Sequence, residues 1–161
     1  MTLRLATQGD WPAIWTILEP VFRAGETYAV DRDISEQAAK AVWMDAPVDT
    51  FIYVGDADEV LGTYYIKTNY SGGAAHVCNC GYVTSIAARG RGIARAMCTD
   101  SLEHAAHLGY RAMQFNLVLV SNVGAVALWQ KLGFKIEGTL PAAFNHPQQG
   151  FVDAHVMWKT L

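Results

Sequence analysis

A buried-strand pattern, a turn with two glycines and a helical pattern follow one another between Gly81 and Leu108. Residues 82–86 are mostly apolar and partly β-branched, which predicts a strand. From Ile93 onward, apolar and small residues recur at helical spacing: Ala94, Met97, Cys98, Ser101, Leu102, Ala105 and Leu108. The small residues of the turn let consecutive backbone N–H groups converge where a helix begins, and helix N-termini attract anions. The stretch therefore predicts a phosphate-binding turn.

Two common phosphate loops do not fit the spacing of this turn. A P-loop requires Lys followed by Ser or Thr after its second glycine, and a dinucleotide loop requires three glycines in G-x-G-x-x-G. The turn carries neither pattern and reads Arg89-x-x-Gly92-x-Ala94. A second motif, Asn122-V-G-A-V-A-L-W-Q-K-L-G-Phe134, follows downstream.

Both motifs resemble those of the GCN5-related N-acetyltransferases, the GNAT superfamily. The first is similar to the pyrophosphate-binding signature R/Q-x-x-G-x-G/A, and the second to N-x-x-A-x-x-L-Y-x-x-x-G-F. The resemblance covers almost the whole chain, 1–161, which by its length we expect to form a single domain. It implies an α/β (α+β) GNAT fold, with a mixed, mostly antiparallel sheet of about seven strands and four helices.

Hydrophobic periodicity and turn residues place these elements along the chain. Strands are expected at 3–6, 51–54, 60–67, 76–86, 113–119, 134–140 and 151–159. Helices are expected after Asp10, after Ser35, at 93–108 and from Asn122 or Ser121 to Gly133. Pro20 should kink or end the first helix, 23–34 should be an irregular loop, and AAFNHPQQG should join the last two strands. In the resulting order, β-α-α-β-β-β-α-β-α-β-β, the resemblance implies that the fourth and fifth strands splay apart and admit the cofactor.

The resemblance implies acetyl-CoA as co-substrate, with its pyrophosphate on the turn and its pantetheine arm against the preceding strand. The implied contacts are Thr84, Ser85 and Ile86 at the strand and Arg89, Gly90, Arg91, Gly92, Ile93 and Ala94 at the turn. Asn122 is expected to touch the pantetheine arm, or only to cap its helix, a position that Asn favours. Trp129 stands where the family carries a Tyr that protonates the thiolate. Because an indole N–H is no acid, Trp129 should pack against the cofactor or within the core.

Residues for the acceptor and for proton transfer come from three segments. The tail, Gly138-T-L-P-A-A-F-N-His146 followed by Gly150-F-V-Asp153, is similar to that of the phosphinothricin-type acetyltransferases. His146 is therefore a candidate for proton transfer, or a loop histidine that caps a carbonyl. Glu26 and Tyr28 lie on the loop where the family builds its acceptor pocket, so Glu26 could hold or deprotonate an amine, or be a solvated acid. Tyr82 and Ser85 could face the thioester, and Asn79 replaces an acid of those relatives, which puts their amino-acid substrate in doubt.

Composition excludes several other classes of protein. The net charge of −3, with scattered basic residues, argues against a nucleic-acid partner. No apolar run approaches the roughly 18 residues of a membrane span, and the start lacks a secretory signal, so we expect a cytoplasmic protein. The three cysteines have no zinc-type spacing and should be buried thiols, and no histidine motif predicts a metal.

The leading interpretation is an acetyl-CoA-dependent N-acetyltransferase that acts on a primary amine of a small or amino-acid-like molecule. A second is acetylation of a protein N-terminus or lysine. A third is an acetyl-CoA sensor without turnover, because Trp129 replaces Tyr and Asn79 replaces an acid. A homodimer that pairs the last strands through Phe144, Phe151 and Trp158 is also expected.

Overall fold

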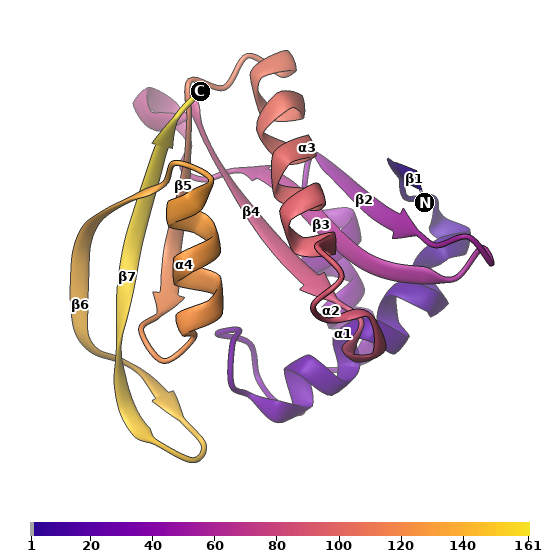
Figure 1. The fold of residues 1–161 in the computed structure, drawn as a ribbon, viewed down its shortest axis with the longest axis horizontal. Helices are drawn as coiled ribbons and strands as arrows, with labels where there is room; N and C mark the ends of the chain where they lie inside the picture. Colours follow the sequence, from indigo (N-terminus) through magenta and orange to yellow (C-terminus); the bar gives the residue numbers. More distant parts are fainter. Residues whose placement is uncertain (1) are drawn as a thin grey trace.

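This computed structural model describes residues 2–161, which contain seven strands and four α-helices. The predicted order of strands and helices is confirmed (Figure 1). The strands are β1 (Thr2–Leu5), β2 (Asp49–Val54), β3 (Val60–Thr68), β4 (Val77–Thr84), β5 (Ala112–Leu119), β6 (Lys135–His146) and β7 (Gly150–Thr160). The helices are α1 (Trp11–Ala24), α2 (Glu36–Lys40), α3 (Ile93–His107) and α4 (Val123–Lys131).

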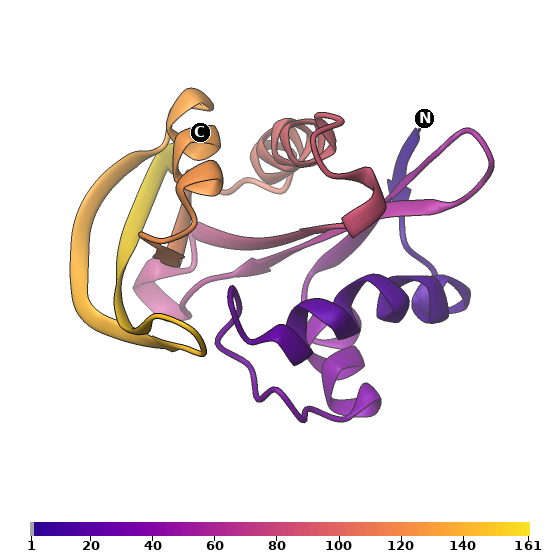
Figure 2. The ribbon, with the colours of Figure 1, turned by 60° about the horizontal axis from the view of Figure 1, so that its bottom comes forward.

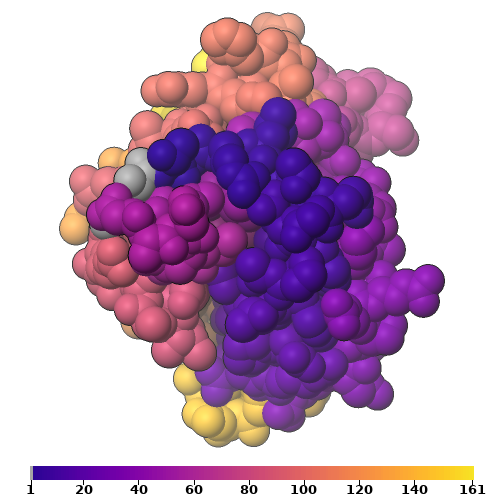
Figure 3. All heavy atoms as spheres, turned by 90° about the vertical axis from the view of Figure 1, so that its right-hand side faces the viewer, coloured from indigo at the N-terminus to yellow at the C-terminus, as the bar shows by residue number. Residues whose placement is uncertain are grey.

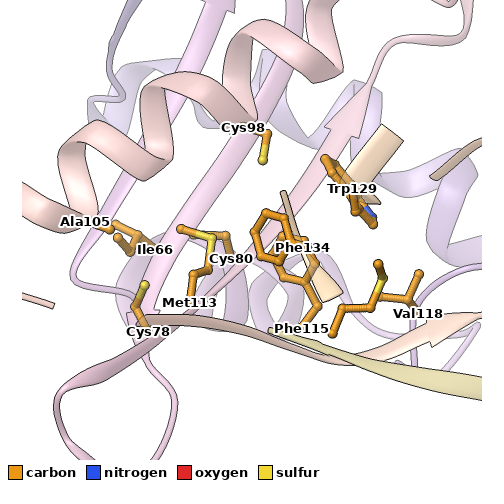
Figure 4. Close-up of a cluster of buried hydrophobic side chains, with 11 residues drawn as sticks. Ile66, Cys78, Cys80, Cys98, Ala105, Met113, Phe115, Val118, Trp129 and Phe134 are labelled. Atoms are coloured by element: carbon orange, nitrogen blue, oxygen red, sulfur yellow. The ribbon is translucent and has the colours of Figure 1, made fainter. Parts of the chain in front are cut away.

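The sheet is covered by helices on both faces. In Figure 2, α1 and α2 lie below it and α3 and α4 above it. The core below the sheet joins α1 to β3 and β4 through residues such as Ile14, Leu18, Trp43, Tyr65 and Val83. The core above it is shown in Figure 4 and consists of Ile66, Cys78, Cys80, Cys98, Ala105, Met113, Phe115, Val118, Trp129, Phe134 and Met157. As expected, all three cysteines are buried free thiols.

The pairing of strands breaks down at the centre of the sheet, whose order is β1-β2-β3-β4-β5-β7-β6. All neighbours are antiparallel except β4 and β5, which run parallel. These two strands pair only at Val77 with Ala112 and at Cys78 with Met113. From Asn79 to Thr84, β4 stays paired with β3 but has no strand partner on its other edge. The splay that the resemblance implied is therefore present.

Several predicted boundaries need correction. Pro20 lies inside α1, which continues to Ala24, so it does not end the helix and the loop begins later than predicted. The helix after Ser35 ends at Lys40 and continues as a π-helical turn, Ala41–Asp45. The strand predicted at 76–86 ends at Thr84, and Ile86 opens a short 3₁₀ helix.

The tail is more regular than its sequence suggests. Most of AAFNHPQQG, predicted as a connection, belongs to β6, because pairing with β7 resumes at Phe144, Asn145 and His146 after an irregularity. The register shift between Leu140 and Phe144 interrupts the ladder only locally, and pairing then continues to His146. His146 is therefore the last residue of a strand, opposite Gly150, and its side chain is buried.

Gly81 in β4 makes room for the ring of Tyr65 in β3. A Cβ atom at Gly81 would lie 2.6 Å from Cε1 of Tyr65. Tyr65 is 9% exposed and its ring lies edge-on to Trp43 at a centroid distance of 4.8 Å, so it has little freedom to withdraw. The glycine therefore lets an aromatic ring lie over the strand at the point where β4 leaves β5.

We expect Gly81→Ala to lower the free energy of unfolding by about 1–3 kcal/mol, because a tightly packed ring must shift to admit the methyl group. Urea unfolding of the two proteins measures the difference. Gly73→Ala is the control, because a Cβ there would meet no atom within 4 Å. Equal stabilities of both variants would show that Tyr65 moves aside freely.

Candidate active site

A cavity of about 710 Å³ opens where β4 and β5 separate. Its lining comes from both faces of the sheet. On the α3 and α4 side it includes Arg89, Gly90, Ala94, Asn122 and Trp129. On the α1 and α2 side it includes Phe22, Tyr28, Trp43, Tyr65 and Lys67. The splay therefore joins the predicted phosphate turn to a compartment under the sheet.

The turn before α3 has the backbone that an anion site requires. Gly92 is the N-cap of this 15-residue helix with φ +79°, and Gly90 has the same φ. A Cβ at either glycine would meet no atom within 4 Å, so the approach to both is open. First-turn amides of a helix point outward and carry partial positive charge. These features fit a pyrophosphate held on backbone amides.

The residues predicted to bind the cofactor do not all face the cavity. Its lining includes Thr84, Arg89, Gly90, Ala94, Asn122 and Trp129, and from the acceptor set it includes Tyr28, Asn79 and Tyr82. It does not include Ser85, Ile86, Arg91, Gly92 or Ile93. Ile86 lies beyond the end of β4 and is 60% exposed, so it is not a strand residue, and its contact with the cofactor stays a prediction. The Ile93 side chain is 2% exposed in a core cluster with Tyr64 and Met97, so only its backbone remains available to a ligand.

Asn122 and Trp129 sit on α4 at the cavity wall. The Asn122 side chain accepts a hydrogen bond from the Ala125 N–H at 3.3 Å, which confirms the helix cap. Trp129 is 9% exposed and lies 5.2 Å, centroid to centroid, from both Tyr82 and Phe115 (Figure 4 shows it beside Phe115 and Phe134). Trp129 therefore belongs to the core and to the cavity wall at once.

Four aromatic rings form the compartment under the sheet. Phe22, Tyr28 and Trp43 contact one another edge-on at centroid distances of 5.6–6.1 Å, and Trp43 meets Tyr65 at 4.8 Å. The Trp43 Nε1–H donates to Thr63 Oγ1 at 3.1 Å, and the Trp43 carbonyl accepts from Thr50 Oγ1. Trp43 lies in the π-helical turn, a feature frequent at functional sites. Trp43 is therefore held both at its indole N–H and at its backbone carbonyl.

Three hydrogen bonds connect residues at the edge of β4 where it leaves β5. The Tyr28 hydroxyl donates to the Tyr82 carbonyl oxygen at 2.8 Å. The Asn79 side chain donates to the Gln114 carbonyl oxygen of β5 at 2.9 Å and accepts from the Tyr65 hydroxyl at 3.3 Å. Asn79 therefore bridges the diverging strands.

The tyrosines around the splay are neutral donors near pH 7. Burial raises the pKa of Tyr28 and of Tyr82 well above the ordinary value, and raises the pKa of Tyr65 to about 12. The Tyr82 hydroxyl is 2.7 Å from Ser101 Oγ, inside the upper core. A protonated tyrosine can donate a hydrogen bond, but a raised pKa makes it a weaker acid than free tyrosine.

Glu26 and His146 both line a second cavity of about 470 Å³. This cavity shares Tyr28, Tyr82, Thr84, Arg89 and Asn122 with the first. In Figure 3 the yellow atoms at the bottom of the view belong to the turn between β6 and β7, and they lie next to the indigo and violet atoms of the N-terminal part of the chain. His146 Nδ1 accepts from the Gln148 N–H at 3.2 Å, so in the neutral ring the proton is on Nε2. The structure thus brings together two groups that lie 120 positions apart in the sequence.

Sequence reasoning missed Trp43, Tyr65, Lys67 and Phe115 as cavity residues. Tyr65 and Lys67 are two positions apart in a strand, so they share a face, but nothing in their spacing indicates what covers that face. A glycine inside a strand can mark a close approach, and Gly81 was such a signal. Among residues 2–161, no group of three or more His, Cys, Asp or Glu could hold a metal ion, and no helix is long and apolar enough to cross a bilayer.

Comparison with known proteins places this architecture in a family. Residues 11–134 match the model described as "Acetyltransferase (GNAT) family". The chain belongs to that family. The GCN5-related N-acetyltransferase from Kribbella flavida is 42% identical with a TM-score of 0.95, covering 99% of this chain and 97% of that one. The GNAT fold is therefore shown.

Other relatives are more distant or much longer. A phosphinothricin acetyltransferase from Sinorhizobium meliloti, solved in complex with AcCoA, is 22% identical with a TM-score of 0.87, over 99% of this chain and 88% of that one. N-acetyltransferase aca1 of Schizosaccharomyces pombe is 36% identical over 98 residues, which are 60% of this chain and 47% of the relative. Protein SPT10 of Saccharomyces cerevisiae is 31% identical over 99 residues, 58% of this chain and 16% of the relative. The matched part thus spans less than half of these two longer proteins.

We expect Gly92→Val to weaken acetyl-CoA binding at least tenfold by calorimetry, because a branched side chain blocks the close approach to the turn and strains a left-handed residue. Gly109→Val is the matched control, because Gly109 lies just past the other end of α3 with φ +85° and equally open surroundings. Both variants should lose similar stability, and only Gly92→Val should lose affinity. Unchanged affinity in Gly92→Val would contradict the proposed phosphate turn.

Proposed function

We propose that this chain is an acetyl-CoA-dependent N-acetyltransferase whose acceptor is the primary amine of a small molecule. The observation that carries the proposal is the single cavity that runs from the glycine turn, past the unpaired edge of β4, to the aromatic compartment. One end of this cavity suits a phosphate-bearing co-substrate, and the other is a pocket of small-molecule size. Family membership supports the same reaction.

Acetyl-CoA would supply the activated acyl group, so the protein achieves much by positioning. The acceptor nitrogen forms a bond to the acetyl carbon, the thioester C–S bond breaks, and the nitrogen releases one proton. The unpaired edge of β4 leaves backbone groups available to orient the acyl donor. Tyr28 fixes this edge through the Tyr82 carbonyl oxygen.

Glu26 and His146 are proposed to receive the amine and its proton. They supply the carboxylate and the imidazole of the second cavity, which adjoins β4 at Tyr82 and Thr84. Glu26 is exposed and would attract a cationic amine, whereas His146 is buried in the wall of the same cavity. The ring nitrogen that carries no proton is Nδ1, which accepts from the Gln148 N–H, so a proton taken up there would displace this hydrogen bond.

If His146 accepts the proton, kcat/KM should rise with pH through the neutral range, and His146→Gln should remove this rise while acetyl-CoA affinity is unchanged. Glu26→Gln should instead raise KM for a cationic amine by up to about fivefold, the loss of one ion pair at an exposed carboxylate. The measurement is the pH profile of thiol release with each variant. A full rate and an unchanged profile in His146→Gln would assign the proton to water or Glu26.

Trp129→Phe should reduce kcat/KM by no more than about tenfold, since the indole offers packing or a hydrogen bond worth about 1 kcal/mol and no acidic proton. Steady-state kinetics with circular dichroism of the folded variant checks this. A loss of several orders of magnitude with the fold intact would reveal a chemical role for the indole.

The other candidate functions are outcomes of one assay. Acetyl-CoA is incubated with small amines and with peptides that carry a free N-terminus or a lysine, and thiol release and acceptor mass are followed. Turnover of peptides alone would favour protein acetylation. Tight acetyl-CoA binding with no turnover of any acceptor would favour the sensor.

A homodimer through β6 and β7 also remains a proposal, supported by the 72% exposure of Phe151, and light scattering would measure it.

A further inference from the structure

The first cavity is lined by two charged side chains, Arg89 and Lys67, and by no carboxylate. Arg89 belongs to the turn before α3, so Lys67 is the charged group of the compartment under the sheet. A cavity wall with only positive charge disfavours an acceptor with several ammonium groups and favours one that carries an anion.

Lys67 stands in β3 beside the aromatic rings. It lies two residues after Tyr65 on the same face of the strand, opposite Asn79 of β4. Its Nζ is 5.4 Å from the centroid of the Tyr65 ring, and the side chain is half-buried. Within residues 2–161, Lys67 forms no ion pair with an acidic side chain. The ammonium is therefore partly withdrawn from water and available to an anionic ligand.

The neighbouring rings, which meet edge to face, provide an apolar wall at a fixed place. Trp43 is held by Thr50 and Thr63, and the Tyr65 ring lies over Gly81. Lys67 lies opposite Asn79 of β4, and Tyr28 binds to Tyr82 of the same strand. Asn79 and Tyr82 are three residues apart, or about 10 Å along the strand. A lysine side chain spans much of that length, so a small molecule can contact Lys67 while its amine lies near Tyr82.

We propose that Lys67 binds a carboxylate of the acceptor while Trp43 and Tyr65 pack against its apolar body. The acceptor class is then an amine that also carries a carboxylate: an amino acid with an apolar or aromatic body rather than a polyamine or a lysine-rich peptide. This inference rests on the proposed acetyltransferase function and narrows its acceptor. Asn79, which replaces an acid of the phosphinothricin-type enzymes, argued against an amino-acid acceptor. Lys67 provides a different basis for binding one.

The test compares each carboxylate acceptor with its own carboxamide. L-phenylalanine, L-leucine and γ-aminobutyrate are assayed beside their amides with wild-type protein, Lys67→Met, Lys67→Arg and the control Lys135→Met, which removes an exposed charge from β6. Comparing the kcat/KM ratio of acid to amide between proteins cancels the different basicity of the two amines. Acetyl-CoA affinity is measured in parallel.

We expect the acid-to-amide ratio to fall about 10- to 100-fold in Lys67→Met, mainly through KM of the acid, because a charge-assisted contact is lost. Lys67→Arg should retain part of the ratio and Lys135→Met all of it. Acetyl-CoA affinity should be the same in all four proteins.

Two results would overturn the inference. The first is an acid-to-amide ratio that does not change in Lys67→Met. The second is wild-type protein that acetylates tryptamine or spermidine but neither acetylates nor binds any of the acids at millimolar concentration. In that second case the proposed function survives. Absence of acetyl-CoA binding, or of turnover of every amine, would contradict the proposed function itself.

Discussion

The separation of β4 from β5 is the constraint on which the site depends. Two parallel strands that pair at only two positions leave one edge of β4 without a partner from Asn79 to Thr84. Unpaired backbone groups inside a protein are costly, so this edge is stable only where side chains, water or a ligand satisfy it. Tyr28 supplies one such bond, to the Tyr82 carbonyl oxygen of β4, and the Asn79 side chain supplies one to the Gln114 carbonyl oxygen of β5. The cavity adjoins the remaining edge.

The two faces of the sheet contribute different chemistry to this opening. Above the sheet, α3 begins at a glycine in a left-handed conformation, which leaves its first amides exposed to an anion. Below the sheet, rigid aromatic rings and one lysine shape a compartment that is apolar and positively charged. In the function proposed above, the upper part of this opening would receive the acyl donor and the lower part the acceptor.

Rigidity around the opening has identifiable sources. Trp43 is hydrogen-bonded to two threonines, and Tyr65 packs closely over Gly81. Trp129 packs against Tyr82, Phe115 and Phe134. The groups proposed to move protons, Glu26 and His146, lie instead on a loop and at the end of a hairpin strand.

Local sequence determined the order of elements, the glycine turn and the helix cap at Asn122, because periodicity, glycine and capping residues act over a few positions. It could not show that β4 ends before Ile86, that His146 completes a strand, or that α1 continues through Pro20, since pairing and packing with distant segments decide these points. The acceptor side depends still more on tertiary structure. Trp43, Tyr65 and Lys67 come from a helical turn and a strand whose shared cavity exists only once α1, α2 and the sheet have packed together.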